Sequence, residues 1–484
     1  MVPISPLHLP HLPSIISLCA YYLCICYFDT KWFERGIAMY DVVYLGSGHS
    51  CWHGAATLAA AGKKVALVDG DLPGGTCTNY GCDAKILLDG PFEFLEGLER
   101  YRGLCIEGDV SIDWSGLMAY KKQFFSYFPQ AMGGMFKMMN LTFIPEFGKI
   151  LDAHTVQAGD QVLKTEHIVI GTGQRDAILD IPGKEFLHTS REFLSIDEMP
   201  ERIVFIGAGI ISMEFASMAL ALGKKVTIIE FAPRALAAYP KKYVDNIVAK
   251  MESQGAELRF GEGVSSVEQI ESGYKVATSA GYEVECDYVL CGAGRVCNVE
   301  NLGLEELGIE ASRRGIVVDD HLRTSVPNIY ASGDVVDKTV PRLTPTAEFE
   351  SNYIADQILG ISDEPICYPV VPNLVFTLPR IAQVGVTVDE ATAQPERYRI
   401  VEMPYGKQNE WIDNRETDIE LTFIIDTEGH LAGAAIYGSE GDTWLDFLTL
   451  IINGKLTGKD LRSMIFAFPT QTYVIASLLA PQLR

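Results

Sequence analysis

Two cysteines, Cys77 and Cys82, lie within the stretch GGTCTNYGCDAK that ends at Lys85. Two thiols at this spacing can close a small disulfide where a loop enters the first turn of a helix, and the helix dipole there lowers the pKa of a thiol. In a reducing cytosol such a pair is more often redox-catalytic or metal-binding than structural. A metal site needs further ligands at close spacing, and no CxxC or His cluster follows. The pattern favours a redox-active pair in a cytoplasmic protein, with no metal site.

A glycine-rich loop precedes the pair. The apolar residues 40–45 predict a strand that leads into Gly46 and Gly48. Because glycine has no Cβ, such a loop lets backbone amides and a helix N-terminus approach a pyrophosphate. The next strand ends at Asp69, where an acid accepts hydrogen bonds from ribose hydroxyls. Cys51 occupies the third glycine position, so we expect the helix to pack less closely here.

A second loop of the same kind follows. Residues 202–206 predict a strand, Gly207 and Gly209 form the loop, and the next strand ends at Glu230. An acid there favours free ribose hydroxyls and repels a 2′-phosphate, so we expect NADH. Arg234 lies four residues later and keeps NADPH open as the less favoured cofactor. Two such units in one chain predict two nucleotide sites.

In order, these motifs resemble those of the FAD-dependent pyridine nucleotide-disulfide oxidoreductases. Further marks are the segments GTG at 171–173, CGAGRVCN at 291–298, YASGDV at 330–335 and TPTAEFE at 344–350. The resemblance runs from about Met39 to the C-terminus. Together with the loop residues, the positions expected to contact FAD or NAD(P)H are Gly46, Gly48, Asp69, Gly75, Thr76, Lys85, Gly148, Thr172, Gly173, Gly207, Gly209, Glu230, Gly294, Asp334 and Ala347.

The resemblance implies a reaction. Hydride from NADH would pass to FAD, and reduced flavin would open the disulfide between Cys77 and Cys82. Cys82 would face the flavin and Cys77 would attack a small-molecule disulfide or another thiol-reactive acceptor. Lys85 and Glu214 match the family's ion pair beside the flavin. Of the nine histidines none is a clear catalytic candidate, and we interpret His49 as a loop residue near the phosphates.

Two departures concern the cysteine pair. The family has an apolar residue, a proline and a small residue between the second cysteine and the lysine, whereas Asp83 and Ala84 alone separate Cys82 from Lys85. One residue is about 100° of helix rotation, so either the gap is absorbed before the helix or Lys85 is misplaced. Asp83 also puts a negative charge beside Cys82, which we expect to resist thiolate formation.

A larger departure lies near the C-terminus. The family's stretch HxHPTxxE, whose second His is an acid–base residue held by the Glu, is here FAFPTQTY, with Phe466, Phe468 and Tyr473 at those positions. Phenylalanine cannot transfer protons, so a contribution of about 10²- to 10⁴-fold is missing. Besides a reductase that obtains its protons elsewhere, two alternatives stay open. One is an enzyme similar to 2-ketopropyl-coenzyme M carboxylase, with Phe468 in place of the His, and the other is a flavoprotein redox sensor.

At 484 residues the chain is long enough for about three domains. The expected fold class is α/β, with two Rossmann-like domains for FAD and NAD and a C-terminal α+β dimerisation domain that implies a homodimer. The expected boundaries are 39–160 and 286–355 for the FAD-binding domain, 161–285 for the NAD(P)-binding domain and 356–484 for the interface domain. A net charge of −24 and a pI of about 4.8 argue against nucleic acid or an anionic membrane as partners.

Residues 1–38 do not fit the rest of the chain. Their apolar run, 15–28, is shorter than the roughly 20 residues that cross a bilayer, and the flanks of a secretory signal are missing. We expect a non-native or disordered extension, with translation starting at Met39.

Overall fold

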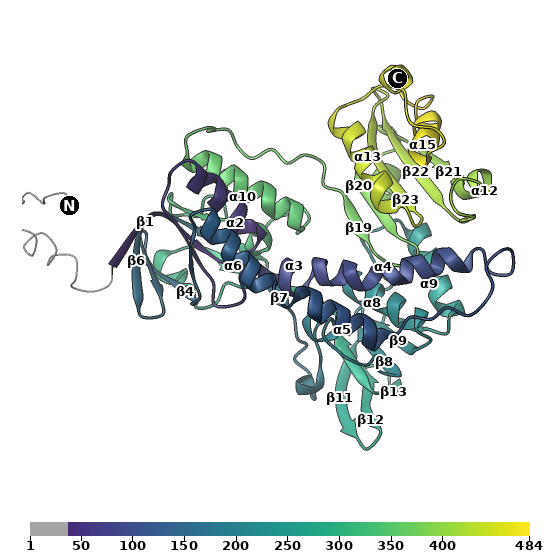
Figure 1. The fold of residues 1–484 in the computed structure, drawn as a ribbon, viewed down its shortest axis with the longest axis horizontal. Coiled ribbons are helices and arrows are strands. Elements are labelled where there is room, and N and C mark those ends of the chain that lie inside the picture. The colour runs from purple at the N-terminus through teal and green to yellow at the C-terminus, as the bar shows by residue number, and fades with distance from the viewer. Residues whose placement is uncertain (1–36) are drawn as a thin grey trace, which may run out of the picture.

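The computed structural model describes residues 37–484, in three units (Figure 1). The expectation for the N-terminal extension therefore lies almost wholly outside the described residues. The first strand, β1, begins at Ile37 rather than at residue 40, because Ile37 and Ala38 continue its parallel pairing with β6.

The first unit is built on a seven-stranded sheet that carries the N-terminal glycine loop. Its strands run in the order β3-β2-β1-β6-β5-β4, with β18 also paired to β6, and β4 to β6 form an antiparallel meander on an otherwise parallel sheet. Along β1, Val42 and Tyr44 pack toward α2 and α10, whereas Val43 and Leu45 face the opposite core. Burial on both faces explains why residues 42–45 of the strand are all apolar. The bounds are β1 (Ile37–Leu45), β2 (Val65–Val68), β3 (Thr142–Ile144), β4 (Gly148–Asp152), β5 (Thr155–Ala158), β6 (Gln161–Ile170), β18 (Ile329–Ala331), α2 (His49–Ala60), α6 (Phe128–Met138) and α10 (Thr344–Ile358).

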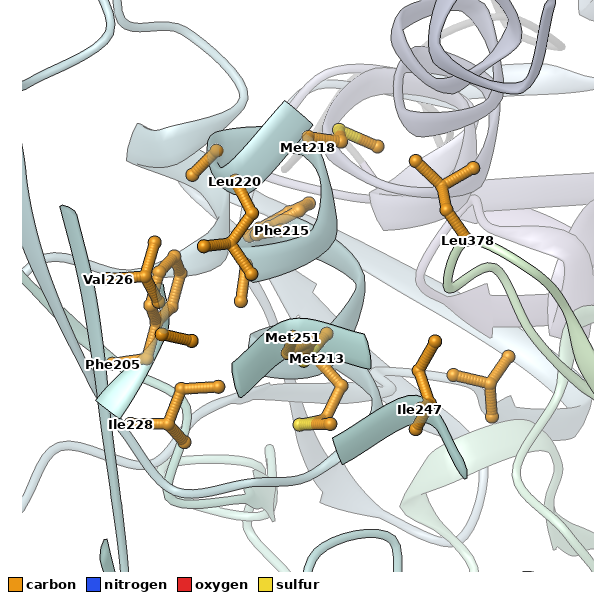
Figure 2. Close-up of a cluster of buried hydrophobic side chains, with 14 of the residues drawn as sticks. Phe205, Met213, Phe215, Met218, Leu220, Val226, Ile228, Ile247, Met251 and Leu378 are labelled. Carbon is orange, nitrogen blue, oxygen red and sulfur yellow. The ribbon is translucent and has the colours of Figure 1, made fainter. Parts of the chain in front are cut away.

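The second unit has a parallel sheet in the order β10-β9-β8-β14 and a separate antiparallel sheet, β11-β12-β13. Its core forms where α8 and α9 cover the parallel sheet: Met213 and Leu220 of α8 lie among Phe205 and Ile228 of the strands and Met251 of α9 (Figure 2). The bounds are β8 (Arg202–Ile206), β9 (Lys225–Glu230), β10 (Glu257–Phe260), β11 (Val264–Ile270), β12 (Gly273–Thr278), β13 (Glu283–Cys286), β14 (Tyr288–Cys291), α8 (Ile210–Ala221) and α9 (Lys241–Ser253).

Two of the expected domain boundaries differ from the sheet pairing. The boundary at residue 161 assigned β6 to the second unit, yet β6 is the central partner of β1 in the first sheet. The boundary at residue 286 assigned β14 to the first unit, yet β14 pairs in parallel with β8. In both cases the unit to which the strand belongs is decided by its hydrogen bonds to a strand that is distant in sequence. The residue pattern within one strand does not reveal which strand it will pair with.

The third unit is C-terminal and consists of an antiparallel sheet, β19-β20-β23-β22-β21, covered by helices. The bounds are β19 (Asn373–Val375), β20 (Ile381–Gly385), β21 (Tyr398–Met403), β22 (Glu420–Asp426), β23 (Leu431–Tyr437), α11 (Val388–Ala393), α12 (Tyr405–Asn409), α13 (Gly441–Asn453), α14 (Gly458–Ser463) and α15 (Gln471–Leu479). Short elements connect the units: α7 (Ser190–Phe193), β7 (Gln174–Asp176), β15 (Arg295–Cys297), β16 (Ala311–Ser312) and β17 (Gly315–Ile316).

Two consecutive helices, α3 (Gly75–Tyr80) and α4 (Cys82–Glu99), link the units, followed by α5 (Trp114–Phe125). Figure 1 shows α4 crossing from the first unit to the C-terminal unit. Its middle is fixed there by Arg380, whose buried guanidinium donates hydrogen bonds to Asp89 at 2.5 Å and Glu93 at 2.8 Å. Among the described residues, no helix has both the length and the apolar character needed to span a membrane.

Candidate active site

A cavity of about 1340 Å³ lies where the two glycine loops, α3, α4 and the C-terminal unit meet. Most of the residues selected from the sequence line it, namely Gly46, Gly48, Asp69, Gly75, Thr76, Cys77, Cys82, Lys85, Gly148, Thr172, Gly173, Gly209, Glu214, Gly294, Asp334 and Ala347. Gly207 and Glu230 do not line it, because they form the inner turn of the second loop and the end of β9. The structure thus brings segments more than 200 residues apart into one site.

The cysteine pair sits at the junction of two helices. Cys77 belongs to α3, Cys82 is the first residue of α4, and both carry free thiols. Gly81 permits the close return of the chain, since a Cβ there would lie 3.2 Å from the Cα of Cys77. The Oγ1 of Thr344 lies 3.9 Å from the Sγ of Cys82.

The two thiols titrate as a pair with opposite shifts. A hydrogen bond from Cys77 to the Cys82 thiolate lowers the pKa of Cys82, with help from Thr344 and Lys85, and the same contact together with burial raises the pKa of Cys77. Asp83 does raise the pKa of Cys82, but its effect is the smallest of these. The expected effect of Asp83 thus has the right direction, but the contact with Cys77 outweighs it and the pKa of Cys82 is lowered overall.

Lys85 forms an ion pair with Glu214 despite the shortened connection. Its Nζ lies 3.2 Å from a Glu214 oxygen and 3.5 Å above the ring centroid of Phe376. Glu214, 5% exposed on the otherwise apolar α8, also accepts the backbone N–H of Phe376 at 2.8 Å. Burial raises the pKa of Glu214, and Lys85 opposes this shift. Because α4 begins at Cys82 itself, Lys85 is one turn along and reaches its partner without displacement.

The two glycine loops have the shape that a dinucleotide requires. Gly46 and Gly207 have φ of +119° and +95°, and a Cβ would lie 2.5 Å and 2.6 Å from the carbonyl oxygens of Gly171 and Gly292. At Gly209 nothing lies within 4 Å of a Cβ, so the N-terminus of α8 faces open space. The open helix terminus, the loop and the cavity together fit a bound pyrophosphate.

The acids that follow each loop make equivalent contacts. The Asp69 carboxylate accepts the backbone N–H of Ser47 at 2.9 Å and its hydroxyl at 2.7 Å. The Glu230 carboxylate accepts the backbone N–H of Ala208 at 2.6 Å. Arg234 donates to the carbonyl oxygens of Tyr239 and Ala237, at 3.0 Å and 2.5 Å. Each acid thus holds its own loop in the same way, and Arg234 is engaged with the backbone.

Cys51, in place of the third glycine, packs against Gly171, and the expected looser packing of the helix stays a prediction. The side chain of Cys51 is fully buried, and a Cβ at Gly171 would lie 2.2 Å from its Sγ. The space that a glycine at position 51 would leave is thus provided by the glycine at position 171.

Sequence reasoning missed several residues of this site. Thr344 and Phe376 contact Cys82 and Lys85 from segments far along the chain; Thr344 begins the predicted segment TPTAEFE, but its contact with Cys82 was not predicted, and no local pattern marks Phe376. His49, interpreted as a loop residue, lines the cavity and contacts His53 one helical turn later. The i, i+4 spacing of the two histidines at the start of a helix was the available signal.

The C-terminal segment that lacks the acid–base histidine is apolar and exposed. Phe468 is 70% exposed and its ring meets that of Tyr473 edge to face at 5.2 Å, while Ile465 is fully exposed. Exposed apolar side chains of this size are typical of a surface that a partner covers.

Comparison with known proteins identifies the family to which this chain belongs. The profile of the pyridine nucleotide-disulphide oxidoreductases matches residues 40–351, and the profile of their dimerisation domain matches residues 371–478. The chain belongs to the pyridine nucleotide-disulphide oxidoreductase family. Its relatives include proteins named dihydrolipoyl dehydrogenase from Chlamydia muridarum, 29% identical over 450 residues, and from Haloferax volcanii, 30% identical over 452 residues. These matches cover 90% and 89% of this chain, and 95% and 93% of the relatives.

Membership of the pyridine nucleotide-disulphide oxidoreductases confirms the predicted family, fold class and enzyme class. The protein is a flavin-dependent oxidoreductase acting on sulfur groups, and it uses FAD and a pyridine nucleotide. The C-terminal unit is the family's dimerisation domain, which supports a homodimer.

Proposed function

We propose that this protein transfers electrons from NADH to a small-molecule disulfide, or to another thiol-reactive acceptor, by means of Cys77 and Cys82. The observation that carries the proposal is the meeting, in one cavity, of the cysteine pair, the Lys85–Glu214 ion pair and both glycine loops. FAD, when bound, supplies the two-electron chemistry that connects a nicotinamide with the cysteine pair.

The chain's own residues have separate tasks in this proposal. Gly46, Gly48 and Asp69 hold the phosphates and ribose of FAD, and Asp334 holds its ribityl chain. Lys85, fixed by Glu214, keeps a positive charge beside Cys82, which favours the Cys82 thiolate. Cys77 is the thiol that forms a bond to the acceptor.

For the pyridine nucleotide we propose NADH. The Glu230 carboxylate opposes a 2′-phosphate by charge. Arg234, the one cation that the sequence offered for such a phosphate, donates to backbone carbonyls and lies 3.6 Å from Asp389. Its engagement supports NADH, and a measured preference for NADPH would reject this part of the proposal.

We further propose a cytoplasmic homodimer. A dithiol that must be regenerated after each turnover is suited to a reducing compartment. The exposed apolar side chains around Phe468 support a second copy of the chain as the partner.

The test is steady-state oxidation of NADH and NADPH by purified, flavin-loaded protein with disulfides, metal ions and oxidants as acceptors. We expect NADH-dependent reduction of disulfides that disappears in Cys77→Ser. Consumption of bicarbonate with a 2-ketopropyl thioether would favour a carboxylase instead. Reversible oxidation of the thiols without turnover on any acceptor would favour a redox sensor.

A further inference from the structure

Three polar side chains lie in a row that begins in the cavity of the cysteine pair: His49, which lines the cavity, hydrogen-bonds to His53, and His53 faces the Glu348 carboxylate. His49 is the first residue of α2, His53 lies one turn later, and Glu348 belongs to α10. The Nδ1 of His49 lies 3.0 Å from the Nε2 of His53, and the Nδ1 of His53 lies 3.5 Å from a Glu348 oxygen. The His53 ring also stacks on Trp52, with ring centroids 3.5 Å apart, which fixes its orientation.

The row determines which nitrogen of each histidine carries the proton. The Glu348 carboxylate favours a proton on the His53 nitrogen that faces it, so the other nitrogen of His53 is an acceptor. His49 must then donate from Nδ1, and its Nε2 is left with a lone pair. In the part of the chain that the structure describes, Nε2 has no hydrogen-bond partner.

His49 is placed next to the segment that carries Cys77. It follows Gly48, whose Cα would lie 2.7 Å from a Cβ on Gly75, so the two chain segments are in backbone contact. His49 lines the same cavity as Cys77 and Cys82. The free nitrogen of a neutral imidazole therefore shares a cavity with two thiols.

Charged and titratable groups reach His49 from three helices. Burial and His53 on α2 lower the pKa of His49, whereas Asp83 on α4 and Glu348 on α10 raise it, and the net shift is downward. The N-terminus of α2 also disfavours the imidazolium. His49 is accordingly neutral near pH 7 and ready to accept a proton.

We propose that His49 is the acid–base residue for thiol–disulfide exchange at Cys77, in the role that Phe468 leaves open, with His53 and Glu348 as positioning residues. The proposal rests on the function proposed above. It assigns to the first glycine loop a task in proton transfer in addition to nucleotide binding.

The exchange balances with His49 in this role. Nε2 takes the proton of the Cys77 thiol, and the Cys77 thiolate attacks one sulfur of the acceptor as the acceptor's S–S bond breaks. The first leaving thiolate takes the proton from His49. The Cys82 thiolate then attacks the Cys77 sulfur and forms the Cys77–Cys82 disulfide, and the second leaving thiolate takes a proton from solution. The dithiol loses two electrons and the acceptor gains two.

His49→Asn tests the proposal, because asparagine can keep the contact to His53 but cannot titrate. Two acceptors separate proton transfer from other effects. The aliphatic thiolate of hydroxyethyl disulfide needs a proton on leaving, whereas the aromatic thiolate of dithiobis-nitrobenzoate leaves without one. We expect both turnovers to fall, because each needs the proton of Cys77 removed, and turnover with hydroxyethyl disulfide to fall further, by about 10²- to 10⁴-fold in all, because it also loses the proton donor. Equal losses with both acceptors, or no loss, would overturn the assignment.

The matched control is His430→Asn, at a turn of the C-terminal unit outside the cavity, which we expect to leave both rates unchanged. The positioning role has its own readout. Glu348→Gln removes a charge that raises the pKa of His49. The acid limb of the pH profile for hydroxyethyl disulfide turnover should therefore move to lower pH. The shift should be small, because Glu348 is 47% exposed. An unmoved limb would overturn the role of Glu348.

A third measurement needs no turnover. In protein reduced with dithiothreitol, the rate of alkylation of Cys77 by iodoacetamide as a function of pH reports its thiolate. We expect the rate near pH 7 to fall in His49→Asn, and an unchanged profile would reject His49 as the base. If wild-type protein fails to reduce any disulfide, the proposed function fails, whereas the alkylation profile still decides the role of His49.

Discussion

The helices α2 and α8 start from equivalent glycine loops but differ in character. Around both loops the frame is the same: a parallel strand, a glycine with positive φ packed against a distant carbonyl, and an acid that accepts a loop N–H. Yet α2 carries His49 and His53 on a polar edge toward α10, whereas α8 is buried and apolar except for Ser212, Ser217 and Glu214. The strand, glycine loop and acid that the two units share fit nucleotide binding. The helix residues that differ, the histidines of α2 and Glu214 of α8, indicate where each unit contributes to the reaction.

The strongest test of this contrast is removal of the thiols attached to the first unit. Cys77→Ser and Cys82→Ser each remove the covalent route, so we expect reduction of hydroxyethyl disulfide by NADH to fall by at least about 10³-fold. Reduction of a dye that forms no bond to sulfur should persist. Cys105→Ser, an exposed cysteine outside the cavity, is the control. Full disulfide reductase activity in either cavity variant would refute the proposed chemistry.

The next test concerns the one charged side chain of α8. Lys85→Met leaves the buried Glu214 carboxylate without its partner, and we expect the free energy of unfolding at pH 7 to fall by about 3 kcal/mol or more. The folded-state pKa of Glu214 lies above its unfolded value, so protonation favours the folded form. The deficit should therefore shrink as the pH falls toward the ordinary glutamate pKa. Urea unfolding between pH 7 and the ordinary glutamate pKa measures this loss of stability. The double variant Lys85→Met with Glu214→Gln is the matched control. A loss of stability that does not change with pH would contradict the explanation.

A smaller effect on stability is expected to distinguish the two glycines of the second loop, Gly207 and Gly209. Gly207→Ala combines a positive φ with a contact of 2.6 Å to the carbonyl of Gly292, so we expect a loss of about 1–3 kcal/mol in stability. Gly209→Ala meets no atom within 4 Å and should unfold like wild type. Its methyl group faces the space in front of α8, and we expect NADH to bind about tenfold more weakly, which corresponds to 1.4 kcal/mol. Equal thermal stability of the two variants would show that the two glycines are not distinct.

The smallest effect concerns the compensation between Cys51 and Gly171 in the first loop. Gly171→Ala should cost about 1–3 kcal/mol, because the new methyl group overlaps the Cys51 sulfur. Adding Cys51→Gly should recover about 1 kcal/mol of that loss in a double-mutant cycle. The recovery is partial because Ser50 also lies close, at 2.8 Å from the added Cβ. Strictly additive unfolding energies would refute the compensation.

Local patterns were sufficient to predict both loops, the cysteine pair and the acids, because each depends on neighbours within one strand–loop–helix segment. Long-range contacts were not accessible from these patterns. The row from His49 to Glu348 spans almost 300 residues, and the sheets that β6 and β14 join also depend on partners that are distant in sequence. The effect of Asp83 on Cys82 has the predicted direction, whereas the larger effect of the hydrogen bond from Cys77 depends on how α3 and α4 meet and was not predicted.

The buried contact of Arg380 with Asp89 and Glu93 attaches the middle of α4 to the C-terminal unit. Cys82 is the first residue of this helix, and Arg100 at its other end forms an ion pair with Glu416 of the dimerisation domain. The helix that begins with a reactive sulfur is thus held along its length by the domain through which family members assemble.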